Sequence, residues 1–235
     1  MLENIQAEFS APSQPPFVEK PNLTSWLEDE HQRDQFLIRE GDNTAVEWFD
    51  ATSNEPIVDY DGARETAAGV KWCESYAHWS THGSHLASLV QSKGVILWSG
   101  PNYEKTGRFK APGVRHVVFS PQENFLLTSS EDLHNPHTTQ IFHVATGELK
   151  RTFPLYPKDM DPDPELEPPP PILWSHDDAY FAQKGVDTLS VYDASTFKIL
   201  DQRSLITEGI ADFAWCPHRN IIAYWAPESK NTPAH

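Results

Sequence analysis

The feature that most constrains the fold is a motif that recurs four times: a large aromatic residue, then Ser or Cys, a short polar turn and an apolar run. The four aromatic residues are Trp79, Phe119, Trp174 and Trp215, so their spacings are 40, 55 and 41 residues. A period of about 40 to 50 residues is typical of repeat architectures, in which each unit is one supersecondary structure. The motif therefore predicts a series of similar modules.

A second motif, an apolar strand that ends in an aromatic residue before a turn, is interleaved with the first. Its copies occupy residues 46–51, 95–100, 140–147 and 189–195. Runs this short, rich in β-branched and aromatic residues and bounded by turn residues, are typical of strands. A unit of three or four strands has the size of a propeller blade, and its faces are buried only when blades stack. We therefore predict an all-β fold, a partial β-propeller; the alternative is a β-sandwich with accidental spacing.

The motifs divide the chain into an arm and a propeller. Residues 1–30 are expected to form an extended Pro-rich N-terminal arm with one short helix near 22–29, and residues 31–235 a partial β-propeller. The expected blades span about 31–59, 70–110, 115–153, 172–201 and 210–235. The long interval of 55 residues is explained by an acidic Pro-rich loop at 154–171, which is either a tolerated surface insertion or a partner motif.

Four to five blades are too few to close a ring, and an open array leaves unpaired strand edges that invite aggregation. We therefore expect the remaining propeller blades to come from a longer parent chain or from a second fragment.

The composition excludes several classes of partner. The chain has 18 Lys and Arg against 34 Asp and Glu, a net charge of −16, so its whole surface cannot coat nucleic acid or an anionic membrane. No apolar run approaches the roughly 20 residues of a membrane span, and the N-terminus lacks the pattern of a secretion signal. Cys73 and Cys216 are too few for a disulfide framework, and Cys216 replaces the Ser of the repeat. This favours a small buried thiol in a reducing compartment over a bridge.

No motif indicates catalysis or metal binding. His78, His82 and His85 have a spacing seen in metal sites, but they straddle a strand, a turn and a strand, so their side chains need not converge. His134 and His137 lie in a polar loop. The sequence has no nucleophile elbow, no zinc-protease helix, no phosphate-binding glycine loop and no dinucleotide fingerprint. We expect no catalytic residue, no cofactor and no metal.

Several stretches resemble a known family. They are 25–27, 33–36, 72–80, 97–100, 117–121, 187–192 and 210–225. Over about residues 17–230 the chain resembles the WD40-like propeller of the b subunit of eukaryotic translation initiation factor three, and it looks most like a fungal member. The resemblance implies a nine-bladed propeller that is a non-catalytic, cytoplasmic scaffold next to the small ribosomal subunit and the a subunit.

The family also carries an RNA-recognition domain and a C-terminal helix that docks the i and g subunits. Neither appears in this sequence, so the i and g partners are expected only of the full protein. Two other interpretations stay open: a WD40-like module of another cytosolic complex, and a propeller enzyme with an axial active site.

One basic cluster stands out against the acidic background. It comprises Lys105, Arg108, Lys110 and Arg115, opposed only by Glu104. If these side chains project from one edge of two neighbouring blades, they form a partner-binding spot for phosphates of ribosomal RNA or for an acidic protein tail. The alternative is a solvated strand edge that charge protects from pairing.

Overall fold

The structure is a computed structural model. It describes residues 29, 31, 33–41, 43–50, 52, 55–90, 93–111, 113–130, 138–154, 172–185 and 187–228. The expected N-terminal arm and its helix, apart from Asp29, lie outside the described residues, and so do the acidic Pro-rich loop from 155 onward and the loop with His134 and His137.

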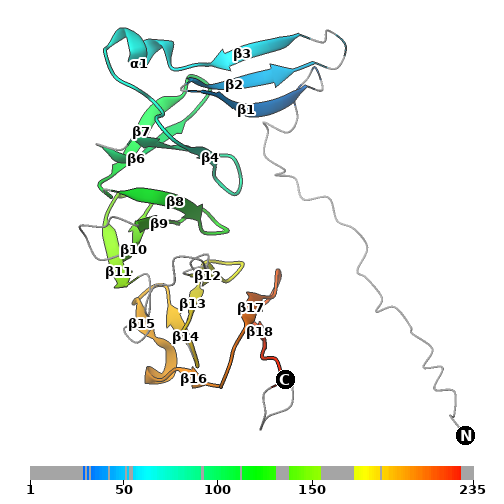
Figure 1. The fold of residues 1–235 in the computed structure, drawn as a ribbon, viewed down its shortest axis with the longest axis vertical. Helices are drawn as coiled ribbons and strands as arrows, with labels where there is room; N and C mark the ends of the chain where they lie inside the picture. The colour runs from blue at the N-terminus through cyan, green and yellow to red at the C-terminus, as the bar shows by residue number, and fades with distance from the viewer. Residues whose placement is uncertain are drawn as a thin grey trace, which may run out of the picture.

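Five antiparallel sheets follow one another along the chain and stack in an arc (Figure 1). The first sheet contains β1 (Asp34–Glu40), β2 (Asn43–Phe49) and β3 (Pro56–Tyr60). The second contains β4 (Ala77–Trp79), β5 (Leu86–Val90), β6 (Gly94–Ser99) and β7 (Glu104–Phe109). The third contains β8 (Val114–Phe119), β9 (Phe125–Ser130), β10 (Thr138–His143) and β11 (Leu149–Pro154).

The fourth sheet contains β12 (Leu173–Trp174), β13 (Tyr180–Lys184), β14 (Thr188–Asp193), β15 (Lys198–Ile199) and β16 (Leu205–Ile206). The fifth contains β17 (Asp212–Trp215) and β18 (Ile222–Trp225). In Figure 1, β12 and β17 lie toward the right of the arc and β7, β11 and β15 toward its left. The all-β prediction is confirmed.

The four repeated aromatic residues occupy matching places in the sheets. Trp79, Phe119, Trp174 and Trp215 are the last residues of β4, β8, β12 and β17, which are the first strands of the second to fifth sheets. Each lies next to the preceding sheet. The predicted period therefore corresponds to a real structural repeat.

The hydrophobic core is divided among the contacts between consecutive sheets, which we call junctions. The first junction buries Trp72, Trp98 and Tyr103, and the second buries Phe109 and Phe119. The third junction buries Phe153, Trp174, Phe181 and Tyr192. The fourth buries Leu189, Ile210 and Phe213. Each sheet thus depends on its neighbours for burial, as expected for a stacked repeat.

Two short elements escaped prediction. A five-residue helix, α1 (Ala63–Ala67), follows the first sheet, and a 3-10 turn (Leu200–Gln202) interrupts the outer edge of the fourth sheet. Because of that turn, β15 and β16 pair with opposite ends of β14. Within the described ranges, neither helical segment has the length or apolar character needed to cross a membrane.

The two cysteines are free thiols. Cys73 is buried, whereas Cys216 is half-buried, although Ser80, Ser120 and Ser175 at the matching positions are all buried. The expected burial of Cys216 is therefore only partial. In the described residues no further sheet follows β17 and β18, so no described sheet covers the turn of Cys216 from that side.

Candidate functional site

In the second, third and fourth sheets, the turns after the first and third strands lie on one rim of the array, because antiparallel strands alternate in direction. The first sheet meets this rim with the start of β1 and the end of β2, where Gln35 and Trp48 pair. Pockets open on this rim at three successive junctions. Their volumes are about 680 Å³ at the first junction, 350 Å³ at the second and 400 Å³ at the third. The rim is thus indented at each of these three junctions.

A ring stack connects the sheets at each later junction. The residue six positions after the repeated aromatic stacks on the repeated aromatic of the next sheet. His85 stacks on Phe119 with ring centroids 6.5 Å apart, and Phe125 stacks on Trp174 at 4.9 Å. Tyr180 lies over Trp215 at 6.4 Å. All three pairs are within 14° of parallel, so the repeat fixes the spacing of the sheets.

A carboxylate reaches back to the preceding sheet at two junctions. Asp178 of the fourth sheet accepts hydrogen bonds from Ser120 Oγ at 2.6 Å, Gln122 N at 3.0 Å and Asn124 Nδ2 at 3.1 Å. Glu123 of the third sheet accepts one from His82 N at 2.5 Å. His82 and Gln122 occupy the same position of the motif, as do Glu123 and Asp178. We call this arrangement the carboxylate clamp.

The backbone presents both acids in the same way. Glu123 has φ 61° and Asp178 has φ 58°, both in the left-handed region, and Gly83 has the matching position in the second sheet. Burial raises the pKa of Glu123, but hydrogen bonds with Ser80, Ser84 and His82 N lower it more, so it stays ionised at neutral pH. The clamp is therefore a charge-assisted contact, the stronger class of hydrogen bond.

The fourth junction uses a different bond. Arg219 replaces the acid of the clamp, and Asn220 Nδ2 instead donates to Asp177 Oδ2 at 2.8 Å. Burial raises the pKa of Asp177, but hydrogen bonds from Asn220, Ser175 and Ala179 N outweigh it and hold the pKa at about 2. The later sheet thus still reaches back to the earlier one.

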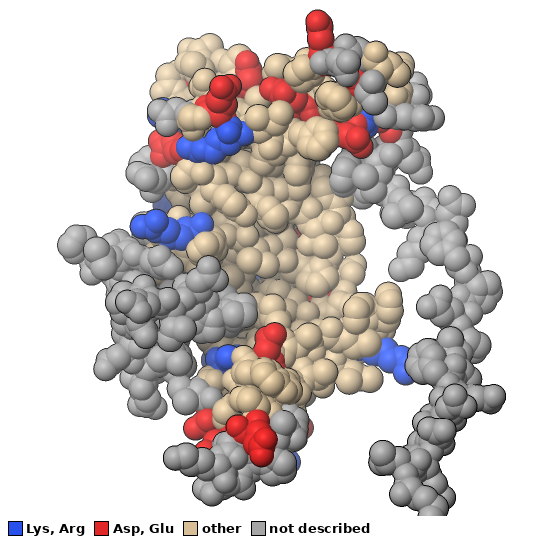
Figure 2. All heavy atoms as spheres, turned by 45° about the vertical axis from the view of Figure 1, so that its right-hand side comes forward, with Lys and Arg blue, Asp and Glu red and all other residues tan. Residues whose placement is uncertain are grey.

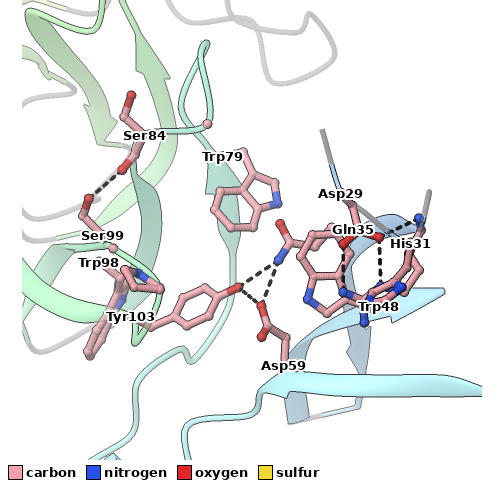
Figure 3. Close-up of a pocket in the computed structure, with 14 residues that line it drawn as sticks. Asp29, His31, Gln35, Trp48, Asp59, Trp79, Ser84, Trp98, Ser99 and Tyr103 are labelled. Atoms are coloured by element: carbon pink, nitrogen blue, oxygen red, sulfur yellow. Dashed lines mark hydrogen bonds and ion pairs between the residues drawn. The ribbon is translucent and has the colours of Figure 1, made fainter. Parts of the chain in front are cut away.

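The first junction is built from other residues and contains the largest of these pockets. Figure 3 shows Trp79 and Tyr103 of the second sheet facing Gln35, Trp48 and Asp59 of the first. Tyr103 OH donates to Asp59 Oδ2 at 2.5 Å, and Gln35 Nε2 donates to the same oxygen at 2.9 Å. Burial, together with the Asp59 carboxylate, raises the pKa of Tyr103 far above its ordinary value, so its hydroxyl remains a donor.

An ion pair lines the other side of this pocket. Arg33 binds Asp29 through Nε at 2.9 Å and Nη2 at 2.8 Å, and its guanidinium lies 4.9 Å from the centre of the Trp48 ring. These hydrogen bonds from Arg33 hold the pKa of Asp29 well below its ordinary value. The pocket therefore combines aromatic faces, one internally paired cation and the carboxylate of Asp59.

The predicted basic cluster is divided between two ends of a strand. Lys105 lies near the start of β7, at the rim with the pockets, whereas Arg108 and Lys110 lie at its other end, about 10 to 16 Å away at ~3.3 Å per residue. Arg115 is on β8, the edge strand of the third sheet that matches β4, so the four do not share one edge. Lys93 lies beside Arg108 and Lys110, because its backbone carbonyl accepts a hydrogen bond from Arg108 Nε at 3.0 Å.

Sequence reasoning missed Lys93 because only the pairing of β6 with β7 brings it to Arg108. All four predicted residues are exposed. On the face shown in Figure 2, described Lys and Arg side chains are scattered, whereas Asp and Glu gather at the two ends of the array.

The three neighbouring histidines have separate surroundings. His78 stacks on Tyr76 at 5.9 Å, His85 stacks on Phe119, and the backbone of His82 binds Glu123. Among the residues that the structure describes, no three His, Cys, Asp or Glu side chains group closely enough to hold a metal ion.

Both ends of the array expose apolar side chains. On the first sheet these are Phe36, Ile38, Phe49 and Val58, and on the fifth sheet Ile221 and Trp225. Trp225 is 56% exposed, which is unusual for Trp and contrasts with the 7% of Trp174 inside a junction.

Comparison with known proteins gives one recurring relative, the B subunit of eukaryotic translation initiation factor 3. The chain is 38% identical to this protein from Xenopus laevis over 98% of its length. The corresponding proteins of Meyerozyma guilliermondii and Arabidopsis thaliana are 32% and 31% identical over 98% and 99% of it. The chain spans about a third of these relatives, 32% to 34%. No family model matches it. Because the relatives span animals, plants and fungi, the fungal expectation is not supported.

Solved structures with the same fold are also found. A structure described as a eukaryotic initiation factor aligns with 86% of this chain and 48% of its own, with TM-score 0.60 and 17% identity. The C-terminal WD40 domain of Sif2 aligns with 84% of this chain and 52% of its own, with TM-score 0.53 and 14% identity. These likenesses, together with the sheet array, confirm the WD40-like propeller prediction.

Proposed function

From its similarity over nearly all of its length to the B subunit of eukaryotic translation initiation factor 3, we propose that the chain is a non-catalytic scaffold within that complex, in the cytoplasm. The observation that carries the proposal is 31–38% identity over 98–99% of the chain to relatives from three kingdoms. The proposed partners are the a subunit and the small ribosomal subunit and, for the full-length protein, the i and g subunits.

The architecture supports a display role. The ring stacks and the carboxylate clamps fix the sheets relative to one another, and the turns on the rim present side chains between them. A rigid array with protruding turns binds partners without itself moving, which is how repeat proteins generally act.

Affinity purification of the full-length protein tests the proposal. We expect initiation-factor subunits and small ribosomal subunits to co-purify. Recovery of a different, stoichiometric cytosolic assembly without any initiation-factor subunit would contradict the proposal and favour a WD40-like module of another complex.

The exposed apolar ends support a second part of the proposal. We infer that further propeller blades, from a longer parent chain or a second fragment, cover Phe36 and Ile38 at one end and Trp225 at the other. The proposed division is an arm at 1–30 followed by blades from 31 to 235. Hydrogen exchange of the β18 amides tests whether another blade covers this strand. Slow exchange is expected in the full-length protein, and exchange as fast as that of an unpaired edge strand would contradict the proposal.

The basic residues are the proposed contact for ribosomal RNA phosphates or an acidic protein tail. The geometry favours a group of Lys93, Arg108 and Lys110 over one that includes Lys105, while Arg115 on β8 is a proposed contact separate from that group. Reversal of Arg108 and Lys110 to Glu is expected to weaken binding to small ribosomal subunits and to flatten its salt dependence. Lys105→Glu at the other end of the same strand is the control, and equal effects of the two changes would contradict the assignment.

A further inference from the structure

The pocket at the first junction has a chemistry that the scaffold does not require. It is lined by three tryptophans and a tyrosine, Trp48, Trp79, Trp98 and Tyr103, together with polar groups from both sheets. Its volume of about 680 Å³ exceeds the 350 and 400 Å³ of the pockets at the second and third junctions. A cavity of several hundred Å³ with aromatic walls and a few polar groups is typical of ligand sites.

The charge in this pocket is unbalanced. Asp29 is neutralised by Arg33, which binds it through two side-chain nitrogens. Among the residues that the structure describes, Asp59 receives hydrogen bonds from Tyr103 OH and Gln35 Nε2, both neutral, and both reach Oδ2. Within the described part of the chain, no hydrogen bond reaches Asp59 Oδ1. One carboxylate oxygen at the pocket wall is therefore open to a further donor.

The pocket already holds one guanidinium against an aromatic face. Arg33 lies 4.9 Å from the centre of the Trp48 ring. Across the pocket, the ring of Trp79 is 6.4 Å from that of Tyr103 and is half-buried, so part of its surface faces the pocket. A planar cation can stack on such a face while it donates to a nearby carboxylate, and Arg does both better than Lys.

We propose that this pocket binds an arginine side chain of a partner polypeptide, with the guanidinium on Trp79 and a hydrogen bond to Asp59 Oδ1. The volume exceeds that of one side chain, so residues that flank the arginine also have room. The acidic net charge of −16 favours approach of a basic segment. The proposal does not depend on membership of the initiation-factor complex.

Titration of the full chain with N-acetyl-arginine amide, followed by the indole NMR signals of Trp48 and Trp79, tests the proposal. We expect saturable shifts at millimolar probe and binding about tenfold weaker for N-acetyl-citrulline amide, which has the same shape without the charge. Equal binding of the two probes, or no saturable shift with the arginine probe, would overturn the proposal. This comparison uses the unaltered protein and does not depend on the folding of a variant.

A pair of matched variants locates the contact. Asp59→Asn is expected to weaken binding of the arginine probe about fivefold or more while it leaves the citrulline probe unchanged. Asp34→Asn is the control, because alternation along β1 places Asp34 on the face opposite Gln35. Equal weakening by both variants would attribute the effect to net charge alone and would also overturn the assignment.

Discussion

The third junction and the first junction solve the same packing problem in different ways. At the third, Phe125 stacks on Trp174 and Asp178 completes a clamp, so rings and hydrogen bonds connect the sheets beside a pocket of about 400 Å³. At the first, Tyr60 stacks on Tyr103 at 4.6 Å, but Trp79 stands beside an open pocket. The comparison indicates that the repeat supplies rigidity, and that departure from the repeat accompanies a larger pocket, about 680 Å³ against about 400 Å³.

The largest expected effect contrasts the two repeated tryptophans. Trp174→Ala should lower the free energy of unfolding by about 4 kcal/mol, because a nearly buried ring leaves a cavity. Trp79→Ala should lower it by only about 2 kcal/mol, because Trp79 is half-buried and borders an existing pocket. Urea unfolding of both variants measures the difference, and equal losses would remove the distinction between the junctions.

Loss of the carboxylate clamp should lower the free energy of unfolding almost as much as Trp174→Ala. Asp178→Ala strands the donors of Ser120, Gln122 and Asn124, which should reduce the free energy of unfolding by about 3 kcal/mol. Asp178→Gly separates the loss of the carboxylate from the backbone strain that alanine adds at a positive φ. Glycine also lacks the carboxylate but adopts φ 58° readily, so Asp178→Gly should reduce the free energy of unfolding by about 1 kcal/mol less than Asp178→Ala. A loss below about 1 kcal/mol for Asp178→Ala would show that the clamp does not stabilise the junction.

The first junction can be strained through its glycine. A Cβ at Gly62 would overlap the ring of Trp72, and Gly62 has φ 78°, so Gly62→Ala should cost about 2 kcal/mol or more. Gly41→Ala is the matched control. Gly41 also has a positive φ, 57°, but no atom lies within 4 Å of where its Cβ would be, so a loss of only about 1 kcal/mol is expected. Thermal unfolding compares them, and similar shifts in Tm would show that the fit against Trp72 is loose.

The smallest expected effect concerns the fourth junction. The pKa of Asp177 is about 2 in the folded state, below its ordinary 3.8, so its contribution to stability is complete above pH 3.8 and is lost as pH falls through 2. Asn220→Ala should raise this pKa, because Asn220 donates to the carboxylate. NMR titration of the carboxyl group measures it, with Asn43→Ala as the control. An unchanged pKa would contradict the assigned contact.

These contrasts also show what the sequence could and could not predict. Trp79, Phe119, Trp174 and Trp215 were recognisable because each ends the first strand of a sheet and is followed by the same short motif. The carboxylate clamp was missed, although an acid at the fourth position after the aromatic was a visible signal in two copies. A sequence shows in which turn an acidic residue lies. Whether its carboxylate can bind the turn of the preceding sheet depends on how closely the sheets stack, which the sequence does not show.

The candidate sites were the least predictable part. Lys105 and Arg108 are three residues apart in sequence, yet they belong to different ends of β7, and Lys93 enters through strand pairing. The pocket of Trp79 and Asp59 combines residues of two sheets that lie far apart in the sequence. Short elements such as α1 and β16 carry too few residues for a periodic signal.

The direction of the clamp has a consequence for biosynthesis. At every junction after the first, the later sheet carries a polar group that binds the turn of the sheet before: these groups are Glu123, Asp178 and Asn220. Other bonds run forward, from Gln122, Arg151 and Lys184 to backbone carbonyls of the next sheet. During translation, each blade therefore emerges with the group that attaches it to a surface already folded. Assembly can proceed vectorially from the N-terminal side, one nascent blade at a time, without waiting for the rest of the polypeptide.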